Sequence, residues 1–357
     1  MTSVKLLPLA IHNLYAELVD RCQEASFASS FPPQGSFRKR TVKGRVYWYY
    51  QDGARDPEIG SQKQRYVGPE SPEILAHIAE HGRLKTAYKE RRSLIAALKR
   101  AGLFSPPQFF GDLLVTLAEA GIFRMRACLV GTFAFTAYEG LLGAKFPGSH
   151  VTTLDLDIAQ FREISLAVAE DEKALPLLEV LKKADPSFEP ALTLNRGDRP
   201  TMYSNAEGLR VDVLVPNRGP DPVGPEPLPA LGSHGQLLRY LDYLIYDPVQ
   251  AVILHDAGVL VNVPRPERFA VHKLIVSQVR PDVAKRHKDL HQARVLFDVL
   301  LQRDRYALVE AFSEALQRGP KWRKRVDGGL ESLGGLDDKL PGRIRDVLTQ
   351  NDGHGDV

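Results

Sequence analysis

Cysteine is scarce in this chain of 357 residues, and long apolar runs are missing. The two cysteines, Cys22 and Cys128, cannot form the disulfide framework of a small secreted protein. No stretch approaches the roughly 20 apolar residues of a membrane-spanning helix, and polar residues interrupt the N-terminal segment too often for a signal peptide. We therefore expect a cytoplasmic protein with no membrane partner.

Three common motifs are missing as well: the Gly-x-Gly-x-x-Gly dinucleotide fingerprint, the Walker A phosphate loop and the Gly-x-Ser-x-Gly nucleophile elbow. What remains is an ordinary globular composition, with 43% hydrophobic and 25% charged residues. The length indicates two or three domains, each able to bury a core of its own.

The net charge of +3 is small but unevenly distributed. Residues 36–100 carry 15 Lys and Arg against 7 Asp and Glu, a local excess of +8. Such an excess suits a phosphate-rich partner, and it is also found on basic faces that are simply solvated.

Changes in residue pattern predict four parts of the chain. Residues 1–108 form a basic module with a helix, a small antiparallel sheet and a long helix. Residues 109–265 alternate strands and helices, and residues 266–320 are helical. Residues 321–357 are Gly-rich and charged, which predicts a partly disordered tail. The fold class is therefore mixed α+β, with a mixed sheet and flanking helices at its centre.

Two aspartates, Asp155 and Asp157, interrupt an otherwise apolar strand-like run. Alternate side chains of a strand share a face, so the two carboxylates lie together, about 6 to 7 Å apart, opposite a core face. Carboxylates this close repel, and each raises the pKa of the other unless a cation lies between them. Mg²⁺, which prefers carboxylate oxygen, would resolve the conflict. The alternative is an exposed face on which both acids are solvated.

A second apolar strand, LRVDVLVP, contains the single acid Asp212. If this strand pairs with the first, Asp212 completes a cluster of three carboxylates. Such a cluster can hold two Mg²⁺ ions, or Mn²⁺ in their place, about 3.5 to 4 Å apart, as in-line nucleotidyl transfer requires.

Gly131 and Thr132 lie where a predicted strand turns into a helix. Glycine allows a close approach of the backbone to a ligand, and the free N–H groups of a helix start favour phosphate. An ordinary helix N-terminus is the alternative interpretation.

This order of elements resembles the polymerase-β-like nucleotidyltransferase superfamily. It is particularly similar to a prokaryotic branch of nucleotidyltransferase-fold proteins related to the toxin-type enzymes of abortive-infection systems. The resemblance covers residues 110–300 and depends on four segments. These are LVGTFAFTAYEGLLG, TTLDLDIA, LRVDVLVP and VPRPERFAVHKLIV.

The resemblance implies that Gly131 and Thr132 contact the β- and γ-phosphates of a nucleotide. It implies that Asp155 and Asp157 ligate both metal ions. Asp212 would ligate the catalytic ion and help to deprotonate the acceptor hydroxyl. The chain departs from the family pattern in one respect: the interval between Gly131 and Asp155 is 24 residues, longer than in compact members. The loop within this interval would reshape or cover the nucleotide pocket.

Basic residues of the C-terminal region are further candidates. Lys273 lies off the apolar stripe of its predicted helix, where it would reach a triphosphate as a lysine of the toxin-type relatives does; a solvated lysine is the alternative. Arg265 precedes the helix. The cluster Lys285, Arg286 and Lys288 follows it. These residues would contact triphosphate or acceptor, or form a solvated face, which we favour for Lys285.

The N-terminal module interleaves basic and aromatic residues. Tyr47 and Tyr49 share one face of a predicted strand, opposite Val46, Trp48 and Tyr50. The first face would stack on nucleic-acid bases while basic side chains hold phosphates. Those basic candidates are Arg38, Lys39, Arg40, Lys43 and Arg45. A sheet that packs its aromatics against the long helix is the alternative, which we favour for Val46, Trp48 and Tyr50.

The leading hypothesis is a Mg²⁺-dependent nucleotidyltransferase that moves a nucleoside monophosphate from an NTP, ATP included, to an acceptor hydroxyl and releases pyrophosphate. The acceptor would be RNA, a tRNA 3′ end included, a protein side chain or a small molecule, and an antitoxin is a further candidate partner. The second hypothesis is a non-catalytic protein of the same fold that binds nucleic acid or regulates a partner.

Overall fold

The computed structural model describes residues 4–25, 32–42, 45–55, 62–147, 154–171, 175–191, 199–219 and 224–352. Within these residues the fold is mixed α+β, as the sequence predicts. No helix in the described part of the chain is both long enough and apolar enough to cross a membrane.

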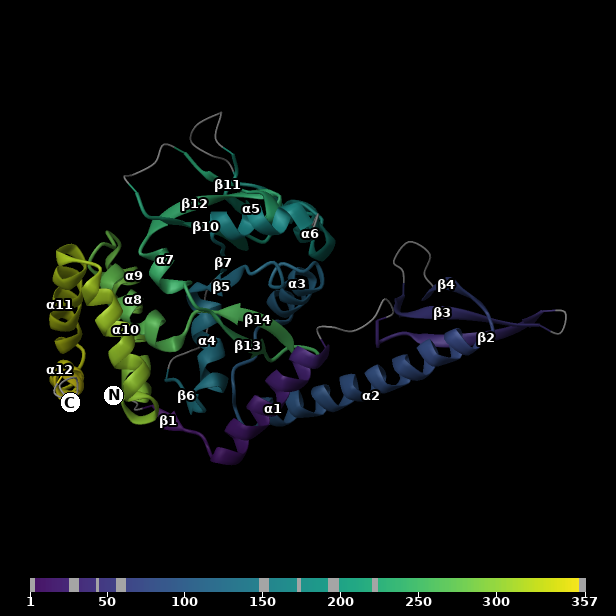
Figure 1. Cartoon of the computed structure of the whole chain (residues 1–357), viewed down its shortest axis with the longest axis horizontal. Coiled ribbons are helices and arrows are strands. Elements are labelled where there is room, and N and C mark those ends of the chain that lie inside the picture. The colour runs from purple at the N-terminus through teal and green to yellow at the C-terminus, as the bar shows by residue number, and fades with distance from the viewer. Residues whose placement is uncertain are drawn as a thin grey trace.

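The N-terminal part holds two helices and a three-stranded antiparallel sheet. The helices are α1 (Leu9–Ala25) and α2 (Pro72–Arg100). The strands, in sheet order, are β2 (Ser36–Val42), β3 (Arg45–Arg55) and β4 (Gln62–Pro69). As expected for an N-cap, the Ser71 hydroxyl accepts a hydrogen bond from the Ile74 N–H. Figure 1 shows the sheet at one end of α2, projecting from the rest of the molecule.

The central sheet has seven strands, five of them in the order β11-β12-β10-β7-β5. In chain order the seven are β5 (Cys128–Val130), β7 (Asp155–Ala159), β8 (Glu189–Pro190), β9 (Met202–Ser204), β10 (Arg210–Asn217), β11 (Glu226–Leu228) and β12 (Ser233–Arg239). Strand β10 runs parallel to β7, and β5 runs antiparallel to β7. Two smaller pairs are β1 (Lys5–Leu6) with β6 (Ala144–Lys145), and β13 (Val249–Ile253) with β14 (Val259–Val263).

Helices surround this sheet. Those of the central region are α3 (Gln108–Glu119), α4 (Gly131–Leu141), α5 (Arg162–Asp171), α6 (Leu177–Ala184), the 3-10 turn η1 (Pro229–Leu231) and α7 (Leu241–Leu244). The C-terminal helices are α8 (Pro266–Ser277), α9 (Val283–Arg303), α10 (Arg305–Gln317), α11 (Pro320–Gly334) and α12 (Leu340–Asp352). In Figure 1 the C-terminal helices lie on the side of the molecule opposite the N-terminal sheet.

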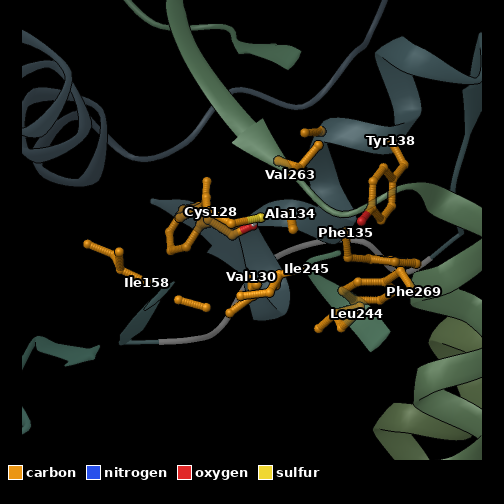
Figure 2. Packing of buried hydrophobic residues seen from close by; sticks show 14 of the residues in the cluster. Cys128, Val130, Ala134, Phe135, Tyr138, Ile158, Leu244, Ile245, Val263 and Phe269 are labelled. Carbon is orange, nitrogen blue, oxygen red and sulfur yellow. Dashed lines mark hydrogen bonds between the residues drawn. The ribbon is translucent and has the colours of Figure 1, made fainter. Parts of the chain in front are cut away.

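One hydrophobic cluster runs from Phe110 in α3 to Ile344 in α12, through both the sheet and the C-terminal helices. At its centre, Phe269 of α8 packs on Phe135 and Tyr138 of α4 (Figure 2). The Tyr138 hydroxyl donates to the Pro264 carbonyl over 2.8 Å. The start of α8 therefore lies near the end of α4.

The prediction of a partly disordered tail is wrong for residues 321–352, which form most of α11 and all of α12. Val326, Leu330 and Leu333 recur at helical spacing and are buried in the main cluster. Burial of this apolar stripe outweighs the unfavourable helix propensity of the glycines between them. Residues 353–357 lie outside the described part of the chain.

Helix α1 is held to the body by one buried tyrosine. The Tyr15 hydroxyl donates to the Val252 carbonyl over 3.1 Å and accepts from the Val252 N–H over 2.9 Å. Around it, a second hydrophobic cluster joins Leu18 of α1, Leu98 of α2 and Val252 of β13. This cluster attaches the N-terminal part to the body.

We predict that Tyr15→Phe lowers the free energy of unfolding by about 1 to 3 kcal/mol, because both backbone groups of Val252 lose their partner in a buried place. Urea denaturation followed by circular dichroism measures the change. Tyr306, which is 66% exposed, provides the matched control Tyr306→Phe, for which we expect no change. Equal stability of the two variants would contradict the prediction.

Candidate active site

The parallel register of β7 and β10 places Asp157 beside Asp212. Both aspartates are half-buried, and their neighbours Leu156, Ile158 and Val211 are fully buried. The alternation predicted from the sequence therefore holds within these strands. Asp155 lies one step along the same face of β7 and is paired in register with Arg210. The predicted juxtaposition of three aspartates on two neighbouring strands is present.

Gly131 lies directly against this pair of strands. It begins α4 with a φ of +67°, a left-handed conformation that favours glycine. A Cβ atom at this position would lie 2.0 Å from Asp157 Oδ2, so a side chain cannot be accommodated there. Asp157 thus packs on the first turn of α4, where Thr132 is half-buried. The predicted Gly-Thr turn and the aspartates come together at one point.

The aspartates lie in an unfavourable electrostatic environment. Burial raises the pKa of Asp157 above its ordinary value; Lys273 opposes this shift, and the nearby Asp155 adds to it. Burial, together with the charges of Asp157 and Asp155, raises the pKa of Asp212 to about 6. Arg210 and Lys285 only partly offset these effects. The cluster therefore lacks positive charge when all of its carboxylates are ionised.

Lys273 supplies part of the positive charge and is itself buried. Its Nζ donates to Asp289 Oδ1 of α9 over 2.5 Å, and Arg280 Nε donates to Asp289 Oδ2 over 3.0 Å. Burial alone would raise the pKa of Asp289, but these two cations outweigh it and lower the pKa. The alternative that Lys273 is a solvated lysine is wrong, because Asp289 holds it inside the protein.

Two exposed lysines of α9 extend this positive region toward the aspartates. Lys285 lowers the pKa of Asp212, although its side chain is exposed, as we favoured for this residue. Burial of the Lys288 ammonium and repulsion from Lys273 lower the pKa of Lys288, while Asp157 and Asp155 oppose that shift. Arg286 instead donates to the Arg280 carbonyl over 3.0 Å.

Arg265 is not brought to the aspartates. Its Nε donates to Asp247 Oδ2 over 2.7 Å at the N-terminal end of α8. Eight residues separate it from Lys273, which is roughly 12 Å along a helix. Because the carbonyl of the preceding Pro264 accepts from Tyr138 near the end of α4, Arg265 lies near that end and not at Gly131, which begins the helix.

The nucleic-acid contacts predicted for the N-terminal module lie on the projecting sheet (Figure 1). The prediction that Lys39 acts together with Arg38 and Arg40 is wrong. Arg38 and Arg40 pair with Tyr49 and Tyr47, whereas Lys39 pairs with Trp48. Strand alternation therefore places Lys39 on the opposite face of the sheet. Lys43 and Gly44 lie outside the described residues. Arg45 begins β3.

Sequence reasoning missed Arg210, whose Nε donates to Asp155 Oδ1 over 2.8 Å. The available signal was its position two residues before Asp212, which gives both side chains the same strand face. Asp289 and Arg280 were missed as well. Asp289 of α9 accepts hydrogen bonds from Lys273 of α8 and from Arg280, which lies between the two helices, and no pattern within either helix predicts these contacts.

In the described part of the chain, no three His, Cys, Asp or Glu side chains are already grouped as ligands of one metal ion. Asp155 is turned to Arg210 instead. The donor chemistry nevertheless fits a hard cation, because Asp157 and Asp212 are neighbouring carboxylates whose raised pKa values report missing positive charge. Asp155 would join them once it releases Arg210.

We predict that Asp212→Asn stabilises the metal-free protein at neutral pH. The pKa of Asp212 is about 6 in the folded protein against 3.8 ordinarily, so the folded state binds more protons between these values. The free energy of unfolding of the natural protein therefore falls as pH rises from about 4 to about 6. The variant lacks this loss, and we expect it to be more stable by about 1 to 3 kcal/mol at pH 7.5.

Urea denaturation in EDTA at pH 4 and pH 7.5 measures the effect. At pH 4 we expect the advantage of Asp212→Asn to disappear, because Asp212 is then protonated in the natural protein. Asp20→Asn, at an exposed position of α1, provides the control. Its difference in free energy of unfolding from the natural protein should be the same at both pH values. An equal advantage of Asp212→Asn at both pH values would refute the electrostatic interpretation.

Comparison with known proteins identifies the family of this chain. No curated protein matches the chain. One similar solved structure is an antigenic nucleotidyltransferase-like protein from Paracoccidioides brasiliensis, with 14% identity, a TM-score of 0.30, and coverage of 62% of this chain and 95% of that one. This similarity is too low to support an argument. A family model described as Nucleotidyltransferase matches residues 108–317, more than half of the chain. The chain therefore belongs to this nucleotidyltransferase family.

Proposed function

We propose that the protein transfers a nucleoside monophosphate from an NTP to an acceptor hydroxyl and releases pyrophosphate. The observation that carries this proposal is the position of Asp157: it lies beside Asp212, on the first turn of α4, and within reach of the positive charge of Lys273. These are the parts that in-line nucleotidyl transfer needs, namely carboxylates, a phosphate-binding turn and a cation.

The phosphates would bind between the start of α4 and the lysines. The N–H groups of a helix start favour phosphate oxygens, and the absence of a side chain at Gly131 lets phosphate approach the backbone. Thr132 adds a hydroxyl donor. Lys273 and Lys288 supply positive charge from the side of α8 and α9.

The acceptor hydroxyl would lie next to Asp212. Its oxygen attacks the α-phosphorus of the NTP, the bond from that phosphorus to the bridging oxygen breaks, and pyrophosphate leaves. Asp212 accepts the proton of the hydroxyl as a general base. Asp155, Asp157 and Asp212 would hold Mg²⁺ or Mn²⁺, which neutralises charge on the phosphates when bound.

The resemblance to toxin-type enzymes adds two finer proposals: RNA, a tRNA 3′ end included, as the acceptor, and an antitoxin as a partner. The basic excess of residues 36–100 supports RNA over a protein or a small molecule. A cytoplasmic location stays a prediction.

We predict that Asp157→Asn lowers transfer at least about 100-fold, because the substitution removes a charge at the reacting phosphates while retaining the size of the side chain. The measurement is incorporation of α-labelled NTP, tested one NTP at a time with Mg²⁺ and total RNA or lysate. Nuclease and protease treatment of the product identifies the acceptor. Asp20→Asn, exposed on α1, should keep full activity. Equal labelling by Asp157→Asn and the natural protein would favour the non-catalytic hypothesis.

A second prediction separates nucleotide binding from chemistry. Lys288→Gln should raise KM for the NTP about tenfold with a smaller change in kcat, because Lys288 contributes charge near the aspartates without being held by a buried partner. Steady-state kinetics measure both constants. Lys324→Gln removes the same charge from an exposed position of α11 and should change neither. A fall in kcat with no change in KM would show that Lys288 does not contribute to binding of the NTP before the reaction.

A further inference from the structure

The projecting sheet has one face that its own module does not bury. Arg38 and Arg40 of β2, Tyr47 and Tyr49 of β3, and Tyr66 of β4 share this face, which we call the outer face. Tyr66 is 59% exposed. These residues lie next to one another across three strands, so the face is a continuous surface of rings and guanidinium groups.

The contacts within the outer face hold the rings in an ordered array. The ring of Tyr66 lies 5.4 Å from that of Tyr49 and 6.4 Å from that of Tyr47, measured between centroids. Arg40 Cζ lies 5.2 Å from the centroid of the Tyr49 ring. Arg38 is also oriented, because its Nε donates to Gln51 Oε1 over 3.2 Å.

The opposite face accounts for the packing of the sheet on α2. Tyr50 is fully buried there, and its ring contacts those of Phe37 and His81. Trp48 on the same face donates to Glu70 over 3.2 Å. The outer tyrosines are therefore not needed to attach the sheet. Tyr47 and Tyr49 are half-buried and lie beside the exposed Tyr66, and such a row of partly exposed rings indicates a surface that binds something.

We propose that the outer face binds single-stranded nucleic acid. Tyrosine rings stack on unpaired bases, and arginine guanidinium groups bind phosphate and stack on aromatic rings. The surroundings are complementary in charge, because residues 36–100 have an excess of +8. An unpaired strand fits this surface and a duplex does not, since the bases of a duplex stack on one another and present no free ring faces.

This inference goes beyond the proposed transfer reaction and does not depend on it. The outer face lies on the projecting sheet, on the opposite side of the fold from the C-terminal helices that border the aspartates (Figure 1). It would hold a strand at a distance from the reaction. If both proposals hold, the acceptor is a nucleic acid that is bound at two places.

Fluorescence anisotropy tests the proposal with the full chain in EDTA and without NTP. The probes are labelled 12-nucleotide oligo(U), oligo(dT) and a mixed RNA sequence, with a duplex of the same mixed sequence. We expect the single strands to bind at least tenfold more tightly than the duplex. Binding of RNA and DNA alike indicates stacking alone, and a preference for RNA adds recognition of the 2′-hydroxyl.

Substitutions on the outer face locate the binding. Tyr49→Ala and Tyr66→Ala should each weaken binding about 5- to 100-fold, whereas Tyr49→Phe, which keeps the ring, should stay within about threefold of the natural protein. Arg40→Gln should weaken binding and reduce the slope of log affinity against log salt by about 0.7. Lys39→Gln removes an equal charge from the opposite face and should have a smaller effect.

Three results would overturn the proposal. These are no binding of single strands by the natural protein, tighter binding of the duplex, or unchanged affinity in both alanine variants when circular dichroism shows that they are folded. Asp157→Asn separates the two proposals: it should bind the strands as the natural protein does even though transfer is lost. Binding without any transfer by the natural protein would refute the reaction and leave the surface intact.

Discussion

The candidate site is organised around two like charges held side by side. Asp157 and Asp212 are neighbours because β7 and β10 pair in parallel register. Buried apolar residues that alternate with the aspartates along each strand hold the two strands in place. Burial raises the pKa of both carboxylates, and repulsion from Asp155 adds to both shifts, with Asp157 adding to that of Asp212. The folded protein without bound cations therefore carries an energetic cost at neutral pH. Two neighbouring residues accommodate this pair. Gly131 leaves space for the Asp157 carboxylate, and Lys273 supplies positive charge that stabilises its ionised form.

Much of this site is predictable from the sequence because it depends on local periodicity. The alternation of acids and apolar residues in β7 places Asp155 and Asp157 on one face, and a glycine between a strand and a helix indicates a close approach. The pairing of Arg210 with Asp155 and the burial of Lys273 were not predictable in this way. Each depends on a partner in another element, Asp155 on the neighbouring strand and Asp289 on the following helix.

In the C-terminal helices, too, contacts between distant elements decide the structure, and here they stabilise helices that the local sequence does not predict. Glycines and charges between residues 320 and 352 predict weak local structure, yet α11 and α12 form because their apolar stripes complete the core around α8, α9 and α10. A stripe of three or four apolar residues is a weak signal without knowledge of the surface that it covers. In the N-terminal sheet the reverse holds: alternation within β3 was sufficient to separate Tyr47 and Tyr49 from Trp48 and Tyr50.

Much of the positive charge around the proposed site is already engaged by carboxylates before any ligand binds. Lys273 and Arg280 are engaged by the buried Asp289, and Arg210 is engaged by Asp155. A triphosphate bound alone would be repelled by the aspartates, and cations bound alone would be repelled by the lysines. Bound together, the two ligands largely cancel each other's charge, and each meets the opposite charge of the protein. Under the proposed function, the arrangement would favour joint binding of nucleotide and cation, and Asp155 would exchange Arg210 for the cation.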